Sequence, residues 1–169
     1  KNSLVLKSTY QAINVRNAIL YNFEKLLYAE KKDGLYNIVI VGGGATGVEL
    51  AGAFAEMTRE ILPKDYPNID SSKVQAYLLE GSPHTLSNMS SFAQKYSEEY
   101  LRSMGVIVKT GTIVKDYDGE KVTLNNGEVI PTSNVIWSAG VTGNVIEGIP
   151  GDSVLPNGRI RVDRINRVA

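Results

Sequence analysis

The sequence contains no cysteine, and it has one histidine and one tryptophan among 169 residues. Without cysteine the chain forms no disulfide, binds no metal through thiolates and has no cysteine nucleophile. The one histidine, His84, lies between loop-forming residues, and we assign it no catalytic role. These absences exclude disulfide scaffolds and cysteine-dependent enzymes, and no cluster of ligand residues predicts a metal site.

Long apolar runs and an excess of one charge are also missing. No stretch approaches the roughly 20 apolar residues that cross a bilayer, and no signal peptide is visible. Eighteen basic residues balance eighteen acidic ones, so the chain lacks the positive surplus typical of nucleic-acid binders. Because the chain begins with Lys1 and ends without an evident closing element, we expect it to be part of a longer protein.

Hydrophobic periodicity predicts alternating strands and helices. A helix is expected from a cap at Ser8 to a stop at Gly34, with Ile13, Leu20, Phe23 and Leu27 near one face. Because strands alternate with helices after it, the pattern predicts a parallel sheet with helical crossovers. The expected strands are 37–41, 74–79, 106–109 and 134–138, and the expected helices are 48–62, ended by Pro63, and 91–104, capped at Ser91.

A different pattern lies between the third and the last of these strands. Segments 112–116, 121–124 and 128–130 are short, and they are separated by Asp118-Gly119 and Asn126-Gly127. Both dipeptides favour tight hairpin turns, so we expect an antiparallel β-meander. Residues 159–162 could form one last strand.

A glycine-rich turn joins the first predicted strand to the next helix. Gly42, Gly44 and Gly47 have the G-x-G-x-x-G spacing: the first permits a tight turn, the second admits a pyrophosphate, and the third lets helix and strand approach. The helix N-terminus offers free amides to phosphates. The alternative is a glycine turn without a ligand, but the strand before it and the helix after it favour a dinucleotide site. The fold is therefore predicted to be a Rossmann-like NAD(P)-binding domain.

Glu80 follows the second parallel strand, where NAD sites place an acidic residue on the adenosine ribose. It lies 33 positions past Gly47, more than the usual roughly 20, and the 63–72 loop accounts for the difference. A carboxylate there would repel the extra phosphate of NADP. The alternative is a solvent-facing glutamate at a strand end.

Three further positions are candidates at this edge of the sheet. Glu49 either stabilises the positive end of the helix or faces the nicotinamide, and the sequence leaves both open. Ala139-Gly140-Val141 closes the last strand, where small residues admit a flat ring, although an ordinary strand-to-loop turn is the alternative. Trp137 is expected in the core.

The segment from Ile38 to Gly52 resembles the NADH-binding segment of type II NADH dehydrogenases, single-chain flavoproteins of the two-dinucleotide-binding superfamily. The stretch from Val135 to Val141 resembles that family's second signature, and Asn14–Asn17 is similar to the segment that enters this domain. The resemblance implies that NADH passes a hydride to FAD, which reduces a membrane quinone. It also implies that Glu49 lies beside nicotinamide and flavin and that Glu80 binds the ribose. The implied cofactor-binding residues are Gly42, Gly43, Gly44, Ala45, Thr46, Gly47, Glu49, Glu80, Gly81, Ala139, Gly140 and Val141.

One glycine fingerprint is present, whereas the family has a second one for FAD. We therefore expect residues 1–34 to enter from an FAD domain, 35–150 to form the NADH-binding domain, and 151–169 to begin the return. FAD is expected in the longer protein, a peripheral membrane protein on the cytoplasmic face, and not in this chain. Two alternatives stay open: the NAD(P)H domain of a related flavin reductase with a disulfide, ferredoxin or peroxide acceptor, or a non-catalytic NAD-binding sensor module.

Overall fold

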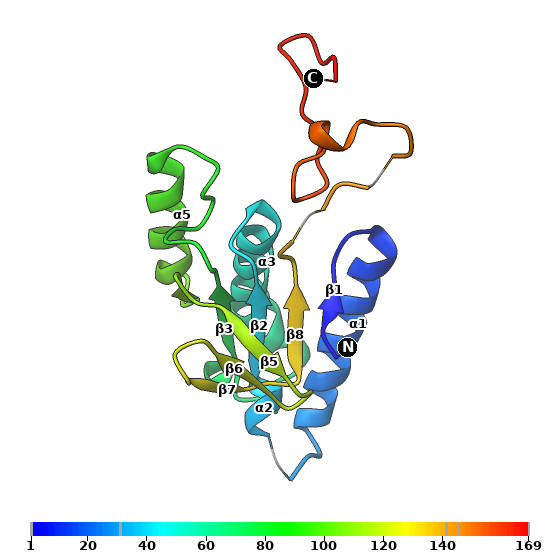
Figure 1. The fold of residues 1–169 in the computed structure, drawn as a ribbon. Helices are drawn as coiled ribbons and strands as arrows, with labels where there is room; N and C mark the ends of the chain where they lie inside the picture. The colour runs from blue at the N-terminus through cyan, green and yellow to red at the C-terminus, as the bar shows by residue number, and fades with distance from the viewer. Residues whose placement is uncertain (1, 31, 141, 145, 169) are drawn as a thin grey trace. The chain divides into compact units, whose positions relative to one another are not determined.

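The computed structural model describes residues 2–30, 32–140, 142–144 and 146–168. The chain divides into two compact units, residues 1–139 and residues 140–169. The first unit contains both β-sheets and the long helices (Figure 1). Each unit is described separately below.

The centre of the first unit is a five-stranded sheet in the order β1-β8-β2-β3-β4, and every pair in it is parallel. The Rossmann-like prediction is therefore confirmed. The edge strand β1 was not predicted, because two residues are too few to show a periodicity. The strands are β1 (Leu4–Val5), β2 (Asn37–Val41), β3 (Gln75–Leu79), β4 (Ile107–Lys109) and β8 (Asn134–Trp137).

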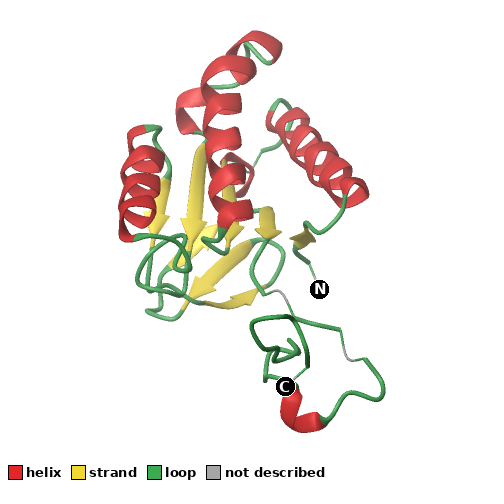
Figure 2. Cartoon of the chain, turned by 90° about the horizontal axis from the view of Figure 1, so that it is seen from above, coloured by secondary structure: helices red, strands yellow, loops and turns green. Residues whose placement is uncertain are grey.

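Helices cover one face of this sheet and a second, three-stranded sheet covers the other (Figure 2). Successive side chains of β2 alternate between the two: Ile38 and Ile40 pack among the helices, while Val39 and Val41 pack against the second sheet. This burial on both faces explains the unbroken aliphatic run in the sequence. The elements are α1 (Thr9–Leu26), α2 (Asp33–Tyr36), α3 (Ala45–Glu56), α5 (Ser91–Ser103), β5 (Val114–Tyr117), β6 (Lys121–Leu124) and β7 (Val129–Pro131).

The second sheet is the predicted antiparallel meander, in the order β5-β6-β7. Gly119 (φ +108°) and Gly127 (φ +84°) occupy the predicted turns in backbone conformations that favour glycine. The carboxylate of Asp118 accepts hydrogen bonds from the backbone N–H groups of Glu120 and Lys121, which fixes the first of these turns.

Helix α1 differs from its prediction in length and orientation. Ser8 caps it as expected, but the helix ends at Leu26 and not near Gly34, which belongs to α2. The predicted apolar face is correct only in part, because Phe23 is fully buried whereas Ile13 and Leu27 are 43% and 36% exposed. The buried face includes Asn22, whose side chain donates a 2.5 Å hydrogen bond to the buried side chain of Asn134 in β8. A polar residue can be buried when it is paired in this way. The buried residues of α1 are Val15, Ile19, Asn22, Phe23 and Leu26.

Pro63 was predicted to end the second long helix, but the helix continues past it. Helix α3 continues through a π-helical turn, η1 (Met57–Ile61), into α4 (Leu62–Asp65). In this turn the N–H of Leu62 donates to the carbonyl of Met57, five residues earlier. Pro63 therefore lies in the first turn of α4, where a missing N–H costs little.

Two smaller expectations are also corrected. The cap of α5 is Ser90 and not Ser91: its hydroxyl accepts from the N–H of Ala93. In the second unit, residues 159–162 form no strand: among the described residues of this unit, the β-pairing consists of the isolated bridges Val154–Ile160 and Val162–Val168. Single-residue bridges offer too few ladder hydrogen bonds for a strand. This unit also contains a 3-10 turn, η3 (Gly151–Ser153), while another, η2 (Ser71–Lys73), precedes β3 in the first unit.

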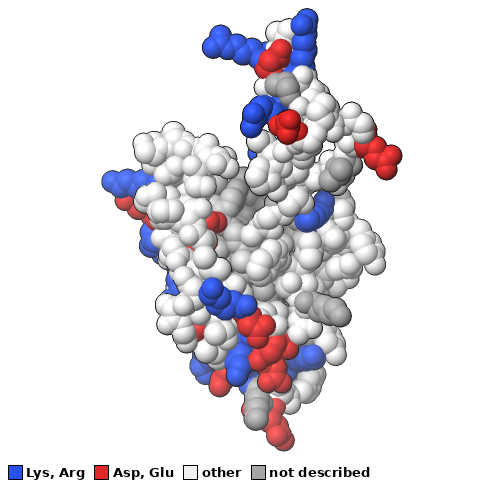
Figure 3. Space-filling view, in the orientation of Figure 1, with Lys and Arg blue, Asp and Glu red and all other residues white. Residues whose placement is uncertain are grey.

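Basic and acidic side chains are intermixed on the face drawn in Figure 3, as equal numbers of both would lead one to expect. Among the described residues, no helix combines the length and the apolar character needed to cross a membrane.

Candidate dinucleotide-binding site

The carboxyl ends of three adjacent strands bring the predicted site residues to one edge of the parallel sheet. Strand β2 lies between β3 and β8, and Val41 is in register with both Leu79 and Trp137. The glycine turn and Glu80 directly follow β2 and β3, and Ala139 follows β8 after one intervening residue, Ser138. Parallel α/β sheets bind their ligands at this edge.

Gly42 and Gly47 are glycines for steric reasons within the protein. Gly42 has φ +111°, and a Cβ there would stand 2.8 Å from the backbone nitrogen of Ala139. A Cβ on Gly47 would stand only 1.8 Å from the carbonyl oxygen of Gly42. The tight turn and the close helix–strand approach predicted from the motif are therefore both present.

At Gly44, by contrast, neither the backbone conformation nor a neighbouring atom requires glycine. Its φ is −71°, and a Cβ built on it would meet nothing within 4 Å. Gly44, Ala45 and Thr46 are all exposed at the N-terminus of α3. The first amides of a helix lack intrahelical acceptors, and they carry the positive end of the helix dipole. This turn can therefore accept an anionic group that approaches Gly44 closely.

Glu80 is half-buried, and its carboxylate contacts the glycine turn. One oxygen, Oε2, accepts a 2.5 Å hydrogen bond from the N–H of Gly43, and Oε1 accepts a 2.6 Å bond from the N–H of Ser82. The solvent-facing alternative for Glu80 is therefore wrong. This contact also accounts for the middle glycine of the turn, because a Cβ on Gly43 would lie 2.9 Å from the Cβ of Glu80. Gly81, the next predicted residue, lies beside Ile113.

Glu49 lies in the first turns of α3 and is exposed. Among the described residues, none donates a hydrogen bond to its carboxylate or pairs with it. Glu49 lines an apolar groove of about 420 Å³ between α3 and α5, together with Tyr96 and Tyr100. These two tyrosines stack with ring centroids 5.9 Å apart. Both interpretations of Glu49 therefore stay open.

The segment after β8 crosses the boundary between the two units. Ala139 belongs to the first unit and packs against Gly42. Gly140, with φ +79°, begins the second unit, and Val141 lies outside the described residues. Trp137 is partly buried and packs against the core on the meander side, in agreement with its prediction.

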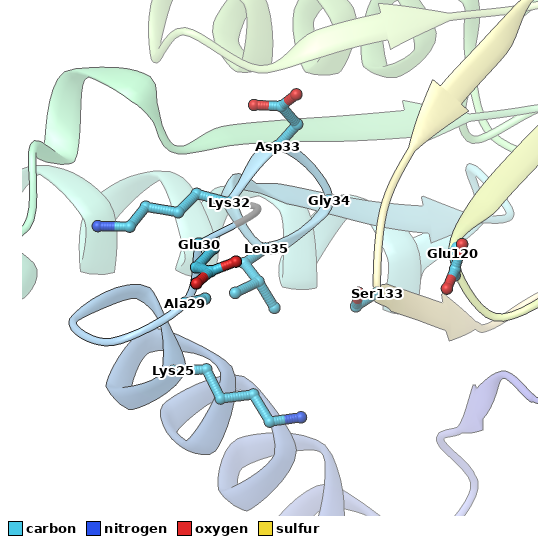
Figure 4. Close-up of a pocket in the computed structure, with 9 residues that line it drawn as sticks. All are labelled: Lys25, Ala29, Glu30, Lys32, Asp33, Gly34, Leu35, Glu120 and Ser133. Carbon is cyan, nitrogen blue, oxygen red and sulfur yellow. The ribbon is translucent and has the colours of Figure 1, made fainter.

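A second hollow, of about 640 Å³, lies at the amino ends of the strands (Figure 4). Its walls include charged side chains of both signs, among them Lys32, Asp33 and Glu120. Gly34 and Leu35 in its wall precede β2, whereas the glycine turn follows that strand. This hollow is therefore separate from the candidate dinucleotide site.

Glu98 on α5 is a charged residue near the site that the sequence analysis did not identify. Its side chain is 13% exposed. Burial alone would raise the pKa of the carboxyl, but hydrogen bonds from the backbone N–H of Thr85 and from the side chains of Arg102 and His84 outweigh it. The pKa of Glu98 therefore lies below its ordinary value. No local pattern marks Glu98, because its contact with Thr85 spans 13 residues.

Replacing this carboxyl should change the pH dependence of stability. A carboxyl with a lowered folded-state pKa stabilises the protein above its unfolded pKa, about 4.3, and the stabilisation is lost as pH falls through the folded-state pKa. We therefore expect Glu98→Gln to be less stable than the wild type at pH 7, and the difference to shrink below about pH 4.3. Urea unfolding from pH 7 to pH 3 measures this. A difference that stays constant over the range would contradict the prediction.

Comparison with known proteins relates the chain to pyridine nucleotide oxidoreductases. The model of the pyridine nucleotide-disulphide oxidoreductase family matches residues 11–169. The type II NADH:quinone oxidoreductase Ndh of Mycobacterium tuberculosis is 31% identical over 96% of this chain and 36% of its own length. A probable NADH dehydrogenase of Dictyostelium discoideum is 32% identical over 83% of this chain and 32% of its own length.

Solved structures agree on the fold. A structure of NDH2 from Plasmodium falciparum in complex with NADH superposes with a TM-score of 0.77 at 21% identity, covering 84% of this chain and 31% of that one. A ferredoxin reductase from Rhodopseudomonas palustris gives a TM-score of 0.60 at 16% identity, over 83% of this chain and 30% of that one. The chain spans about a third of the length of the relatives it matches. By its match over residues 11–169, the chain belongs to the pyridine nucleotide-disulphide oxidoreductase family.

Proposed function

We propose that this chain binds NADH and is the NADH-binding part of a flavin-dependent NADH:quinone oxidoreductase. One observation carries the proposal: an open glycine at the N-terminus of α3 lies next to a carboxylate at the end of the neighbouring strand. Gly44 leaves free space where a side chain would stand, and Glu80 contacts the same turn. A pyrophosphate flanked by a ribose requires this combination. The names of the relatives support the same activity.

The proposed complex assigns a task to each segment of the site. The pyrophosphate lies against Gly44 and the first amides of α3, where the helix dipole favours negative charge. Glu80 accepts hydrogen bonds from the adenosine ribose, and the nicotinamide extends toward Ala139 at the end of β8. Glu49, exposed and without a hydrogen-bond partner among the described residues, is the proposed catalytic residue at the nicotinamide–flavin junction.

The longer protein is proposed to supply the FAD domain and the attachment to the membrane. When bound, NADH would supply a hydride, and its acceptor would be an FAD held by the rest of the longer protein. We propose that residues 35–150 form the NADH-binding domain, that 1–34 enter it from the FAD domain, and that 151–169 begin the return. Because quinones dissolve in the bilayer, the longer protein is proposed to attach to the membrane surface, on its cytoplasmic face.

A related flavin reductase is the second candidate. A putidaredoxin reductase and a ferredoxin reductase share the fold with TM-scores of 0.60. At sequence identities of 20% and 16%, these two similarities support the shared fold and not a shared function. The type II NADH:quinone oxidoreductase of Mycobacterium tuberculosis is 31% identical over most of this chain. The quinone reductase is therefore the favoured function.

Cofactor preference tests the proposed site. We expect the wild type to bind NADH at least about tenfold more tightly than NADPH, because the Glu80 carboxylate accepts from the ribose hydroxyls and repels a 2′-phosphate. A charge-assisted hydrogen bond contributes roughly 1.5–3 kcal/mol, so Glu80→Gln should weaken NADH binding about 10- to 100-fold. NADPH should lose less, because Glu80→Gln also removes the repulsion. Isothermal titration calorimetry with both nucleotides measures these affinities.

Glu99→Gln is the matched control for this experiment. Glu99 lies on α5, its side chain is 63% exposed, and it pairs with Lys95 at 3.7 Å. It has no contact with the glycine turn, so this variant should keep the wild-type preference. A wild type that binds NADPH as tightly as NADH would contradict the role of Glu80, and a wild type that binds neither would contradict the proposed function.

A further inference from the structure

The loop between β3 and α5 returns to the glycine turn after Glu80. Glu80 accepts from the N–H of Gly43, and a few residues later the N–H of Leu86 donates to the carbonyl oxygen of Gly43 at 2.8 Å. Both polar groups of Gly43 are therefore bonded to this loop. Leu86 has φ +49°, a conformation that is uncommon for a leucine and needs support from its surroundings.

Helix α5 provides that support through the residue before Leu86. Thr85 is fully buried. Its hydroxyl lies 2.7 Å from the hydroxyl of Ser97, and its N–H donates to Oε1 of Glu98 at 3.1 Å. Because Ser97 and Glu98 are neighbours on α5, the helix holds both the side chain and the backbone of Thr85.

Glu98 is itself held in place by two further groups. Arg102, one turn along α5, donates to Oε2 of Glu98 at 3.1 Å and also reaches the carbonyl of Val108 in β4 at 3.3 Å. The ring of His84 lies 3.3 Å from Oε1. The carboxylate therefore connects α5 to the loop that contacts Gly43, and Arg102 links this carboxylate to β4.

We propose that Glu98 is a positioning residue of the dinucleotide site, which holds the 82–86 loop against Gly43 and so fixes the adenosine side of the site. The inference rests on the proposed function, because it assigns the ribose to Glu80, whose own carboxylate is bonded to this loop through Ser82. Glu98 acts through Thr85 and touches no nucleotide.

The position of the loop gives the proposal a specific consequence. The loop follows β3, on one side of β2, whereas Ala139 follows β8 on the other side. Releasing the loop should therefore weaken binding of the adenosine half of the dinucleotide and leave the nicotinamide half unchanged. General destabilisation of the fold would weaken both halves alike.

The experiment compares Glu98→Ala with Glu99→Ala, its neighbour on the same helix without a loop contact. Affinities for ADP-ribose and for reduced nicotinamide mononucleotide are measured by NMR titration, and hydrogen exchange of the Thr85 amide is followed in the same samples. We expect Glu98→Ala to weaken ADP-ribose binding roughly tenfold, the cost of ordering a released loop. We expect the affinity for the mononucleotide to remain unchanged and Thr85 to exchange faster. Glu99→Ala should match the wild type in all three measurements.

Glu98→Gln provides the rescue test and covers the case in which the alanine variant does not fold. A glutamine retains a carbonyl oxygen that accepts from the Thr85 N–H, so most of the ADP-ribose affinity should return. Equal loss of both half-ligands, or faster Thr85 exchange with unchanged ADP-ribose affinity, would overturn the positioning role while leaving the proposed function intact. A wild type that binds no NADH would overturn both, although Thr85 exchange would still report the contact with Glu98.

Discussion

Gly44→Val should abolish NADH binding while the protein stays folded. The backbone at position 44, with φ −71° and ψ −178°, is extended and open to any residue, and a Cβ there meets nothing within 4 Å. The valine methyl groups would instead fill the space that we assign to the pyrophosphate. Charge-assisted hydrogen bonds contribute roughly 1.5–3 kcal/mol each, so losing two should weaken binding on the order of 100-fold or more. Calorimetric titration with NADH measures the loss.

Gly151→Val is the matched control. Gly151 also lacks a positive φ, and a Cβ there would also meet nothing within 4 Å, but it lies in the 3-10 turn η3 and not in the turn after β2. This variant should bind NADH as the wild type does. Circular dichroism should be unchanged in both variants, and thermal unfolding should show that both are folded at the temperature of the titration. Undiminished NADH affinity in Gly44→Val would mean that the dinucleotide does not lie on this turn.

Gly47→Ala should, in contrast to Gly44→Val, strongly destabilise the folded protein. The added Cβ would stand 1.8 Å from the carbonyl oxygen of Gly42, a backbone atom at the end of the central strand. A flexible side chain could rotate away, but this carbonyl can move only if the strand or the helix moves. We expect a loss of more than about 3 kcal/mol in the free energy of unfolding. Urea unfolding followed by tryptophan fluorescence measures it.

Gly52→Ala separates this clash from the general effect of alanine in a helix. Gly52 lies in α3 as well, but a Cβ there would lie 3.9 Å from the side chain of Leu101, an ordinary contact. Because alanine is the better helix former, Gly52→Ala should stabilise the protein by about 0.5–1 kcal/mol. If Gly47→Ala proved as stable as the wild type, the close approach of α3 to β2 would be wrong.

The strongest local signals in the sequence were sufficient to predict their elements. The aliphatic run at 37–41 became β2 with the predicted bounds, because a strand buried on both faces must be apolar throughout. The two glycine turns of the meander were also placed correctly, since positive φ restricts the choice of residue. The same steric requirements made the tasks of Gly42 and Gly47 predictable from the sequence.

Weaker local signals were overridden by contacts between distant segments. The buried face of α1 was predicted only in part: Phe23 is buried as expected, but Ile13 is exposed, and the hydrogen bond to Asn134 allows the polar Asn22 to be buried. Pro63 was expected to end a helix, but the preceding π-helical turn places it where a proline is tolerated. Strand β1 exists only because β8 offers it a parallel partner.

For the site, the sequence by itself determined which segments matter: a glycine turn, an acidic residue after the next strand, and small residues after β8. Each is a local requirement of backbone conformation or of ligand chemistry, so residue type and spacing reveal it. Only the tertiary structure decided how these segments are connected. The carboxylate of Glu80 lies on the N–H of Gly43, and Glu98 holds Thr85 from another helix. Such contacts join residues 37 and 13 positions apart, and no local pattern records them, because only the tertiary fold brings each carboxylate within hydrogen-bond distance of the other residue's backbone N–H.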